Sequence, residues 1–163
     1  MAEYHVIDEL LSCLVTAGVV QRWNTTVSTT IPGAVIGPLK GAPLPRDTEP
    51  ATVTLRQSGV TQANGMDAWL QETAIEVIVR ARSAPAGRLL HRSIRGVIHP
   101  RGSFPARTNW QMTASLLVER AYIWRGEQTI PPQMSQAEGQ RDLVTYDTTE
   151  SYMFAVRRAL LST

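Results

Sequence analysis

The sequence has one cysteine, little net charge and no dense block of basic residues, and each of these scarcities excludes a class of site or function. Because Cys13 has no second cysteine to join, the chain forms neither an internal disulfide nor a cysteine metal cluster. Cys13 lies in an apolar helical stretch, so we expect a small buried hydrophobic side chain rather than a reactive thiol. The net charge of +2, spread along the chain, argues against a dedicated DNA-binding protein.

Long hydrophobic runs are also missing. No run is long enough to cross a membrane, and the chain does not open with a basic segment followed by an apolar one. We therefore expect a protein that stays in the cytoplasm where it is made. With 163 residues, 43% of them hydrophobic and 18% charged, and with no internal repeat, the chain is interpreted as one globular domain over residues 1–163.

Sequence motifs of catalysis and cofactor binding do not occur. None of the three histidines has a second histidine or a cysteine at metal-ligand spacing. A phosphate-binding loop, a dinucleotide fingerprint and a serine nucleophile elbow are likewise missing. The carboxylates are densest at Asp142, Asp147 and Glu150, which we interpret as solvated strand positions rather than an acid–base pair. We predict that the protein is not an enzyme, with no catalytic residue, metal or cofactor.

A strand followed directly by a helix stands at the centre of the sequence. Residues 72–82 alternate between apolar and polar side chains, which is typical of a half-buried strand. Pro85 suits the first turn of a helix, where its missing N–H would have no partner. Within residues 86–98 the apolar side chains share one helical stripe, so this helix is predicted to pack on the sheet. The stripe consists of Leu90, Ile94, Val97 and Ile98.

Three arginines share the other side of this helix. Arg88, Arg92 and Arg95 are spaced by four and three residues, which predicts that all three point away from the apolar stripe. One interpretation is a solvated surface with a few local ion pairs. The other is contact with an acidic partner, either a protein or nucleic acid phosphates. Three arginines are too few to indicate nucleic acid by themselves.

A hairpin is predicted before the central strand. Residues 51–57 alternate as a strand, and Asn64-Gly65 is the strongest turn signal in the chain. The two strands should therefore form an antiparallel hairpin with a long tip over residues 58–70. Upstream, residues 4–17 form a helical stripe that ends at Gly18.

Other segments predict extended strands and loops. Residues 19–31 favour a strand, whereas the prolines and glycines of residues 34–50 forbid long regular structure. Residues 110–124 have apolar side chains on both faces, which predicts one strand that is buried on both sides, either inside the fold or against a partner chain. Residues 126–140 are polar and contain Pro131 and Pro132, so we expect a loop.

The last segment, residues 142–158, alternates as a long strand and should pair with the strand before the loop. The whole pattern predicts an α+β fold, with two helices on a mainly antiparallel sheet of about four to five strands.

Several segments follow one another in an order that is found in a known family. The N-terminal helix is followed by Ala34-Val35-Ile36-Gly37-Pro38-Leu39 and a proline-rich link to Ala51-Thr52-Val53-Thr54-Leu55. Ile75-Glu76-Val77-Ile78-Val79-Arg80-Ala81-Arg82 then precedes a helix directly, and residues 141–158 make a long closing strand. In these features the sequence resembles the tail terminator (minor capsid or neck) proteins of long-tailed bacteriophages, especially actinobacteriophages. The likeness covers most of the chain and lies in the order and general character of its segments. The loop at residues 126–140 departs from it.

This resemblance implies a structural protein of the virion that is assembled in the host cytoplasm. Such proteins form a ring, usually of six copies, on the head-proximal end of the tail tube. The ring ends tube polymerisation and offers its other face for head–tail joining, while DNA passes through the lumen without sequence-specific binding. The implied partners are further copies of the chain, the tail tube protein and a head-completion or connector protein, with no membrane.

Two alternatives stay open: another head–tail connector component, such as a head-completion or adaptor protein, and a small nucleic-acid-binding regulator. Within a ring we expect the tip at residues 58–70 and the loop at residues 126–140 to contact adjoining proteins. Met66 and Trp69 near the tip are either core residues at its base or exposed anchors for a neighbouring subunit. The candidate interface residues are Asn64, Gly65, Met66, Trp69, Arg88, Arg92, Arg95, Pro131 and Pro132.

Overall fold

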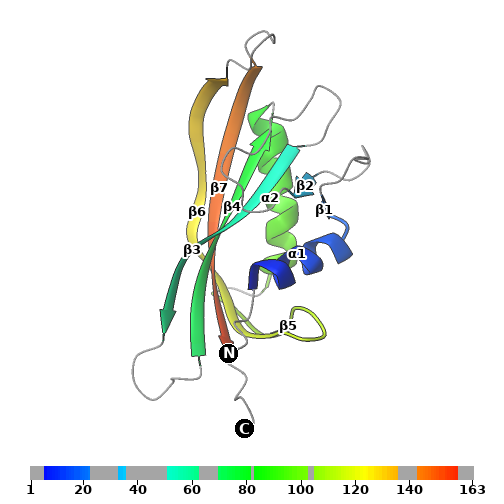
Figure 1. Cartoon of the computed structure of the whole chain (residues 1–163), viewed down its shortest axis with the longest axis vertical. Coiled ribbons are helices and arrows are strands. Elements are labelled where there is room, and N and C mark those ends of the chain that lie inside the picture. Colours follow the sequence, from blue (N-terminus) through cyan, green and yellow to red (C-terminus); the bar gives the residue numbers. More distant parts are fainter. Residues whose placement is uncertain are drawn as a thin grey trace.

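The computed structural model describes residues 6–22, 33–35, 51–62, 70–81, 83–102, 105–135 and 143–157 (Figure 1). Its elements, in chain order, are α1 (Val6–Thr16), β1 (Gln21–Arg22), β2 (Gly33–Val35), β3 (Ala51–Gln62), β4 (Leu70–Ala81), α2 (Ala84–Ile98), β5 (Arg107–Gln111), β6 (Leu117–Ser135) and β7 (Leu143–Arg157).

The described strands form one twisted sheet in the order β1-β2-β3-β4-β7-β6-β5. The strands β3, β4, β7, β6 and β5 pair antiparallel, whereas the short strands β1 and β2 add in parallel at one edge. The closing strand β7 lies between β4 and β6, so it connects the β3–β4 hairpin to β6 within the sheet. The predicted α+β class and mainly antiparallel sheet are confirmed.

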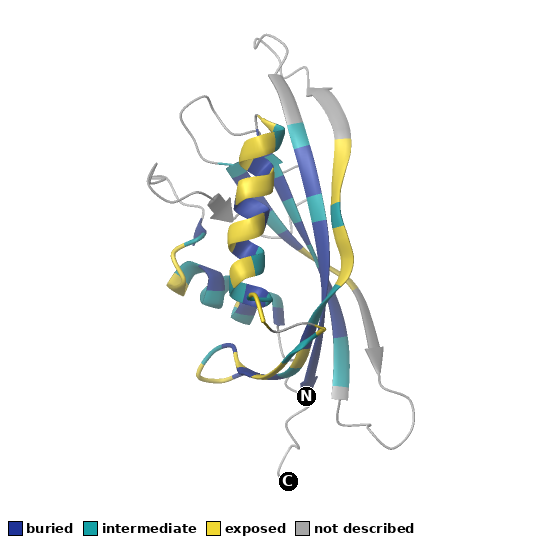
Figure 2. Cartoon of the chain, turned by 180° about the vertical axis from the view of Figure 1, so that it is seen from behind, coloured by how far each residue is buried: buried dark blue, intermediate teal, exposed yellow. Residues whose placement is uncertain are grey.

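Both helices lie on the same face of the sheet, and the hydrophobic core fills the space between them and the strands (Figures 1 and 2). The apolar stripe of α2 supplies Leu90, Ile94 and Ile98, all buried. The strands supply alternate residues, as the period of two requires. Central members of this core are Leu10, Leu14, Val53, Leu55, Ile75, Val77, Val79, Tyr152, Phe154 and Val156.

Local signals explain where the helices begin and end. The helix α1 stops before Gly18, whose φ of +76° is a left-handed conformation that glycine adopts without a steric penalty. At the start of α2, the Ser83 hydroxyl accepts a hydrogen bond from the backbone N–H of Ala86 at 3.3 Å. Pro85 lies in the first turn, as predicted. Neither helix in the described part of the chain is long and apolar enough to span a membrane.

The hairpin before the central strand is confirmed, but its strands are longer than predicted. The ladder between β3 and β4 runs from Thr52 opposite Arg80 to Gln62 opposite Gln71. Residues 58–62 therefore belong to β3, where a bulge between Gln57 and Gly59 absorbs the break in alternation that suggested a loop. Asn64, Gly65, Met66 and Trp69 lie outside the described residues.

The prediction of one strand over residues 110–124 is wrong, because the chain turns between β5 and β6. The backbone N–H of Met112 donates to the carbonyl of Leu116 at 3.0 Å and closes this turn. Glu9 of α1 accepts hydrogen bonds from the hydroxyls of Thr113 and Ser115 and fixes the turn against the helix. Buried apolar residues on both sides of the turn hid it in the sequence pattern.

The prediction of a loop over residues 126–140 is wrong for its first part. The strand β6 continues to Ser135, which lies opposite Leu143 of β7, and the predicted pairing of the last two strands is confirmed. Pro131 and Pro132 lie inside β6, within a register shift between Ile130 and Gln133. Proline is tolerated there because bulges and edge strands leave N–H positions without a ladder partner. Residues 136–142 lie outside the described part.

Two N-terminal predictions are tested only in part. Of residues 19–31, predicted as a strand, Gln21 and Arg22 form the short β1, and residues 23–31 are not described. Of the stretch 34–50, predicted to lack long regular structure, Ala34 and Val35 belong to the short β2, and the remainder is not described. Cys13 is half-buried, and burial raises the pKa of its thiol, in keeping with an unreactive side chain.

Candidate functional site

The exposed side of α2 carries two of the three predicted interface arginines. Arg88 and Arg92 are exposed, and Leu89 between them is the most exposed large hydrophobic residue of the described chain, at 62%. We call Arg88, Leu89 and Arg92 the cationic face. The helix contains no acidic residue. Among the described side chains, none forms an ion pair with Arg88 or Arg92, so the surface keeps its positive charge.

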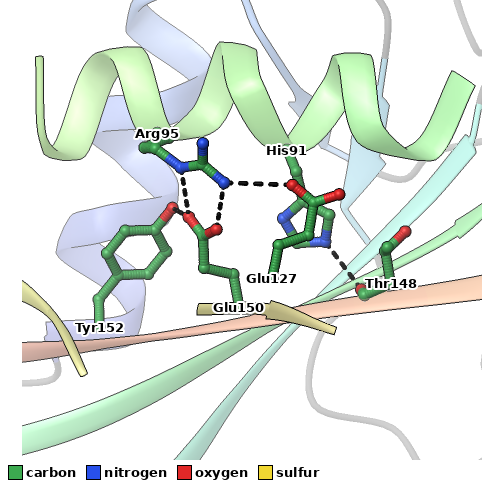
Figure 3. A network of polar contacts seen from close by, with 6 residues as sticks. All are labelled: His91, Arg95, Glu127, Thr148, Glu150 and Tyr152. Atoms are coloured by element: carbon green, nitrogen blue, oxygen red, sulfur yellow. Dashed lines mark hydrogen bonds and ion pairs between the residues drawn. The ribbon is translucent and has the colours of Figure 1, made fainter. Parts of the chain in front are cut away.

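The prediction that Arg95 shares this outward face is wrong. Its Nε donates to Glu150 Oε1 at 2.9 Å, and its Nη2 contacts both Glu150 Oε2 and Glu127 Oε2, the latter at 3.2 Å (Figure 3). Relative to Ile94 at the centre of the apolar stripe, Arg95 is rotated by about 100° and Arg92 by about 160°. Arg95 therefore sits at the border of the stripe, from which its long side chain reaches the sheet.

Glu150 is buried, which corrects the interpretation of a solvated carboxylate. Its side chain is 1% exposed and receives hydrogen bonds from the Tyr152 hydroxyl as well as from Arg95 (Figure 3). Glu150, Tyr152 and Phe154 occupy every second position of β7 and therefore share one face. Glu150 thus points toward α2 with the rest of the core. That alternation was visible in the sequence, and extending it back from Phe154 would have placed Glu150 inside.

Asp147 points to the other face of the sheet, which neither helix covers. There it forms two parallel bonds with Arg80 of β4, Nε to Oδ1 and Nη2 to Oδ2, both at 2.9 Å. Its side chain is only 11% exposed, so it too is a paired rather than a solvated carboxylate. The bond to Asp147 raises the pKa of Arg80. Asp142 lies outside the described residues.

A buried histidine lies one turn before Arg95. His91 is fully buried, and its Nε2 lies 2.8 Å from the carbonyl oxygen of Thr148 in β7 (Figure 3). Since a carbonyl only accepts, Nε2 carries the proton and donates. Burial lowers the pKa of His91 against the opposing effects of this hydrogen bond and of Glu150 and Glu127, so the ring is neutral. In the described chain, Nδ1 has no hydrogen-bond partner.

The six residues His91, Arg95, Glu127, Thr148, Glu150 and Tyr152 form what we call the α2 network. The hydrogen bond with Glu150 raises the pKa of Arg95, and burial together with the neighbouring carboxylate raises the pKa of Tyr152. The arginine therefore stays charged and the tyrosine stays a phenol across the physiological range. Glu127, Thr148 and Tyr152 were not anticipated as site residues from the sequence; Glu127 and Thr148 bond residues of α2 that lie far away in the chain, and Tyr152 joins through Glu150.

The α2 network positions a helix, and its two central side chains are shielded from solvent. Glu150 and His91 are sealed between α2 and the sheet. The helix also lies close to β7: a Cβ on Gly87 would come within 2.8 Å of Thr148 Oγ1. Together these contacts fix α2, and with it the cationic face, against β7 and β6. No group of three histidine, cysteine or acidic side chains in the described part could hold a metal ion.

In the described part of the chain, three cross-strand ion pairs lie on the helix-free face of the sheet. Arg56 pairs with Glu76, Arg80 with Asp147, and Arg120 with Glu72 at 2.9 Å. The Arg120 side chain reaches across β7, where the intervening residue is the small Ala155. Among the described residues, charge on this face is therefore balanced between strands rather than gathered into a patch.

The part of β6 beyond its pairing with β5 carries an exposed aromatic side chain. Trp124 is 43% exposed, and the Arg125 guanidinium lies 4.6 Å from its ring centre. Of the other predicted interface residues, Pro131 and Pro132 lie in the distal part of the same strand. No known protein-family model matches the sequence, and a search of curated proteins found no match either.

Proposed function

We propose that the chain is a structural protein of a bacteriophage virion. In this proposal, six copies form a ring on the head-proximal end of the tail tube, as in the family that the sequence resembles. The ring ends tube polymerisation and provides the surface for head–tail joining. The observation that carries the proposal is the order of elements on which the resemblance rests: α1, the β3–β4 hairpin, α2 directly after β4, and the long closing strand β7.

The distribution of surfaces supports this role. A subunit of a ring contacts its neighbours through two different surfaces, and in this role it also contacts the tube on one side and the head on the other. The cationic face projects from the helical layer, while the β3–β4 and β6–β7 hairpins extend past the two ends of that layer (Figure 1). A single chain thus offers separate contact regions on its helix side and at both ends of its sheet.

The α2 network supports the role by holding the cationic face rigidly. A buried carboxylate with an arginine and a tyrosine as donors specifies one position of α2 on the sheet, since any shift would leave the Glu150 charge unpaired. The partner suited to Arg88, Leu89 and Arg92 is an acidic protein surface with an apolar pocket. The alternative of a DNA-binding regulator loses support, because only two of the three arginines of α2 face outward.

The proposal is tested by removing the protein during assembly. Without it, we expect tail tubes of uncontrolled length together with full heads that carry no tails, seen by electron microscopy. Antibody against the chain should label the head–tail junction of intact virions. Tubes of normal length joined to heads, or virions that lack the protein, would contradict the proposal.

A further inference from the structure

The sheet has two long stretches of edge that no described strand covers. The strand β2 pairs with β3 only as far as Val53, so among the described strands residues 54–62 have a neighbour on one side alone. The strand β5 pairs with β6 only as far as Ala121, so within the described part of the chain residues 122–130 are likewise covered on one side. We call these the β3 half-edge and the β6 half-edge. Each presents backbone N–H and C=O groups that a further strand could bond.

The two half-edges have the directions that a repeated sheet requires. From one to the other the strands are β3, β4, β7 and β6, and each pair is antiparallel. Four alternating strands leave β3 and β6 running in opposite directions. A second copy in the same orientation therefore places its β3 antiparallel beside β6, and the alternation continues without a fault.

The two half-edges also lie at similar positions along the strands, with a small offset. Following the register, Gln57 of β3 is level with Ile75, Tyr152 and then Ile123 of β6. The middle of the β3 half-edge thus lies roughly three residues, or about 10 Å, from the middle of the β6 half-edge along the strand direction. Joining the two shifts each copy by that amount, which is the kind of stagger that lets a tilted sheet close into a ring.

We propose that the β6 half-edge of one copy pairs with the β3 half-edge of the next. This interface is head-to-tail, as a closed ring of identical copies needs, and the proposal rests on the ring of the proposed function. Each half-edge is bounded by a short strand of its own chain, β5 below the β6 half-edge and β2 above the β3 half-edge. The neighbouring copy fits between these limits.

Bulges and prolines restrict this pairing to one arrangement. The β3 half-edge is kinked between Gln57 and Gly59, and β6 has register shifts between Ile123 and Arg125 and between Arg125 and Gln128. Such bulges protect an edge against unspecific pairing, and a partner strand must follow their curvature. Pro131, which has no N–H, ends the β6 half-edge. The prolines predicted as interface residues thus set the length of the joint.

Cysteine crosslinking tests the pairing in the full chain. In a Cys13→Ala background, one variant carries Ser58→Cys on the β3 half-edge, and a second carries Gln128→Cys or Ile130→Cys on the β6 half-edge. Co-expressed chains treated with a short bismaleimide should give a covalent dimer. Each variant alone should give none, because equal half-edges never meet in a head-to-tail joint. A chain with both cysteines should give a ladder that ends at the size of the closed ring.

A matched control and three outcomes complete the design. Leu89→Cys, on the cationic face, replaces the β6 cysteine and should not crosslink to Ser58→Cys. Crosslinking within a single variant would overturn the proposal in favour of a two-fold joint. The proposal would also be overturned if no crosslink forms in samples that native mass shows to be oligomeric. If the chain alone is monomeric, the absence of every crosslink on capped tubes would overturn it. Tubes capped without crosslinks would refute the pairing alone, whereas crosslinked rings that never cap tubes would refute the proposed function alone.

Discussion

Gly87 is the residue at which α2 comes closest to the sheet. A methyl group added there would lie 2.8 Å from Thr148 Oγ1, whereas one added at Gly96 of the same helix would meet nothing within 4 Å. Gly87→Ala should therefore destabilise the protein by about 1–2 kcal/mol despite its better helix propensity. Gly96→Ala is the control and should stabilise it by about 0.5–1 kcal/mol.

Urea denaturation of the two variants measures the difference. Adding Thr148→Ala to Gly87→Ala should restore most of the lost stability, because the Thr148 hydroxyl has no hydrogen-bond partner in the described chain. An unchanged midpoint for Gly87→Ala alone would show that α2 does not approach β7 this closely.

Arg95 is the second residue whose role is structural. Arg95→Gln removes the guanidinium from a carboxylate that is 1% exposed, so Glu150 keeps only the Tyr152 hydroxyl. We expect a loss of roughly 2–4 kcal/mol in the free energy of unfolding, since an unpaired buried charge is costly. Arg92→Gln on the exposed side of the helix should change it by less than about 0.5 kcal/mol. Equal effects of the two substitutions in thermal unfolding would contradict the α2 network.

His91 makes stability depend on pH. Burial lowers its pKa in the folded protein, so below the unfolded value of about 6.5 the unfolded chain binds more protons than the folded one. Its contribution is complete above about pH 6.5 and is lost as the pH falls, by at most about 1.4 kcal/mol per pH unit for one proton. His91→Gln, whose amide can still donate to Thr148, should lose less stability between pH 7.5 and pH 5.5. Parallel pH profiles for the two proteins would show that His91 does not titrate on unfolding.

At the scale of elements, the parts with a strong local pattern were predicted well. The β3–β4 hairpin, the stop of α1 at Gly18 and the first turn of α2 at Pro85 all depend on neighbours in sequence. The turn between β5 and β6 was missed because Thr113 and Ser115 are held there by Glu9, about a hundred residues earlier in the chain. The length of β6 was missed because the prolines lie in a register shift that only pairing with β7 defines.

The candidate site, too, was predicted only where the sequence pattern is local. Helical periodicity identified Arg88 and Arg92 as surface residues but could not say which way a residue at the border of the stripe turns. Arg95 turns inward because it forms ion pairs with Glu127 of β6 and Glu150 of β7. Periodicity describes the faces of an element, whereas ion pairing between elements depends on the register of the sheet.

The exposed side of α2 leads to a prediction about assembly. Arg88→Gln combined with Arg92→Gln should leave the fold intact, because both side chains are exposed. Assembly with tube and head proteins should weaken, and its sensitivity to salt should decrease, since fewer charges remain to be screened. Sedimentation of mixed components at low and high salt measures both effects. Ser93→Gln is a matched control on the same exposed side and should assemble normally. Assembly that is unchanged by the double substitution would leave the cationic face as an ordinary solvated surface.

On the scale of the whole molecule, the two faces of the sheet differ in kind. One face is covered by α1 and α2 over a continuous hydrophobic core (Figure 2). The other is uncovered by either helix and has its charges balanced by ion pairs between strands. The half-edges lie at opposite edges of this sheet. Copies joined through them would keep the helices of every subunit on the same side, which is what a ring with distinct inner and outer surfaces requires.

Native mass spectrometry of the pure chain, alone and mixed with tail tube subunits, tests most directly the claim that copies join into a closed ring. The account predicts one closed oligomer of fixed size, formed either by the chain alone or on the tube ends. A chain that stays monomeric under both conditions, or one that grows into open polymers of many sizes, would contradict it.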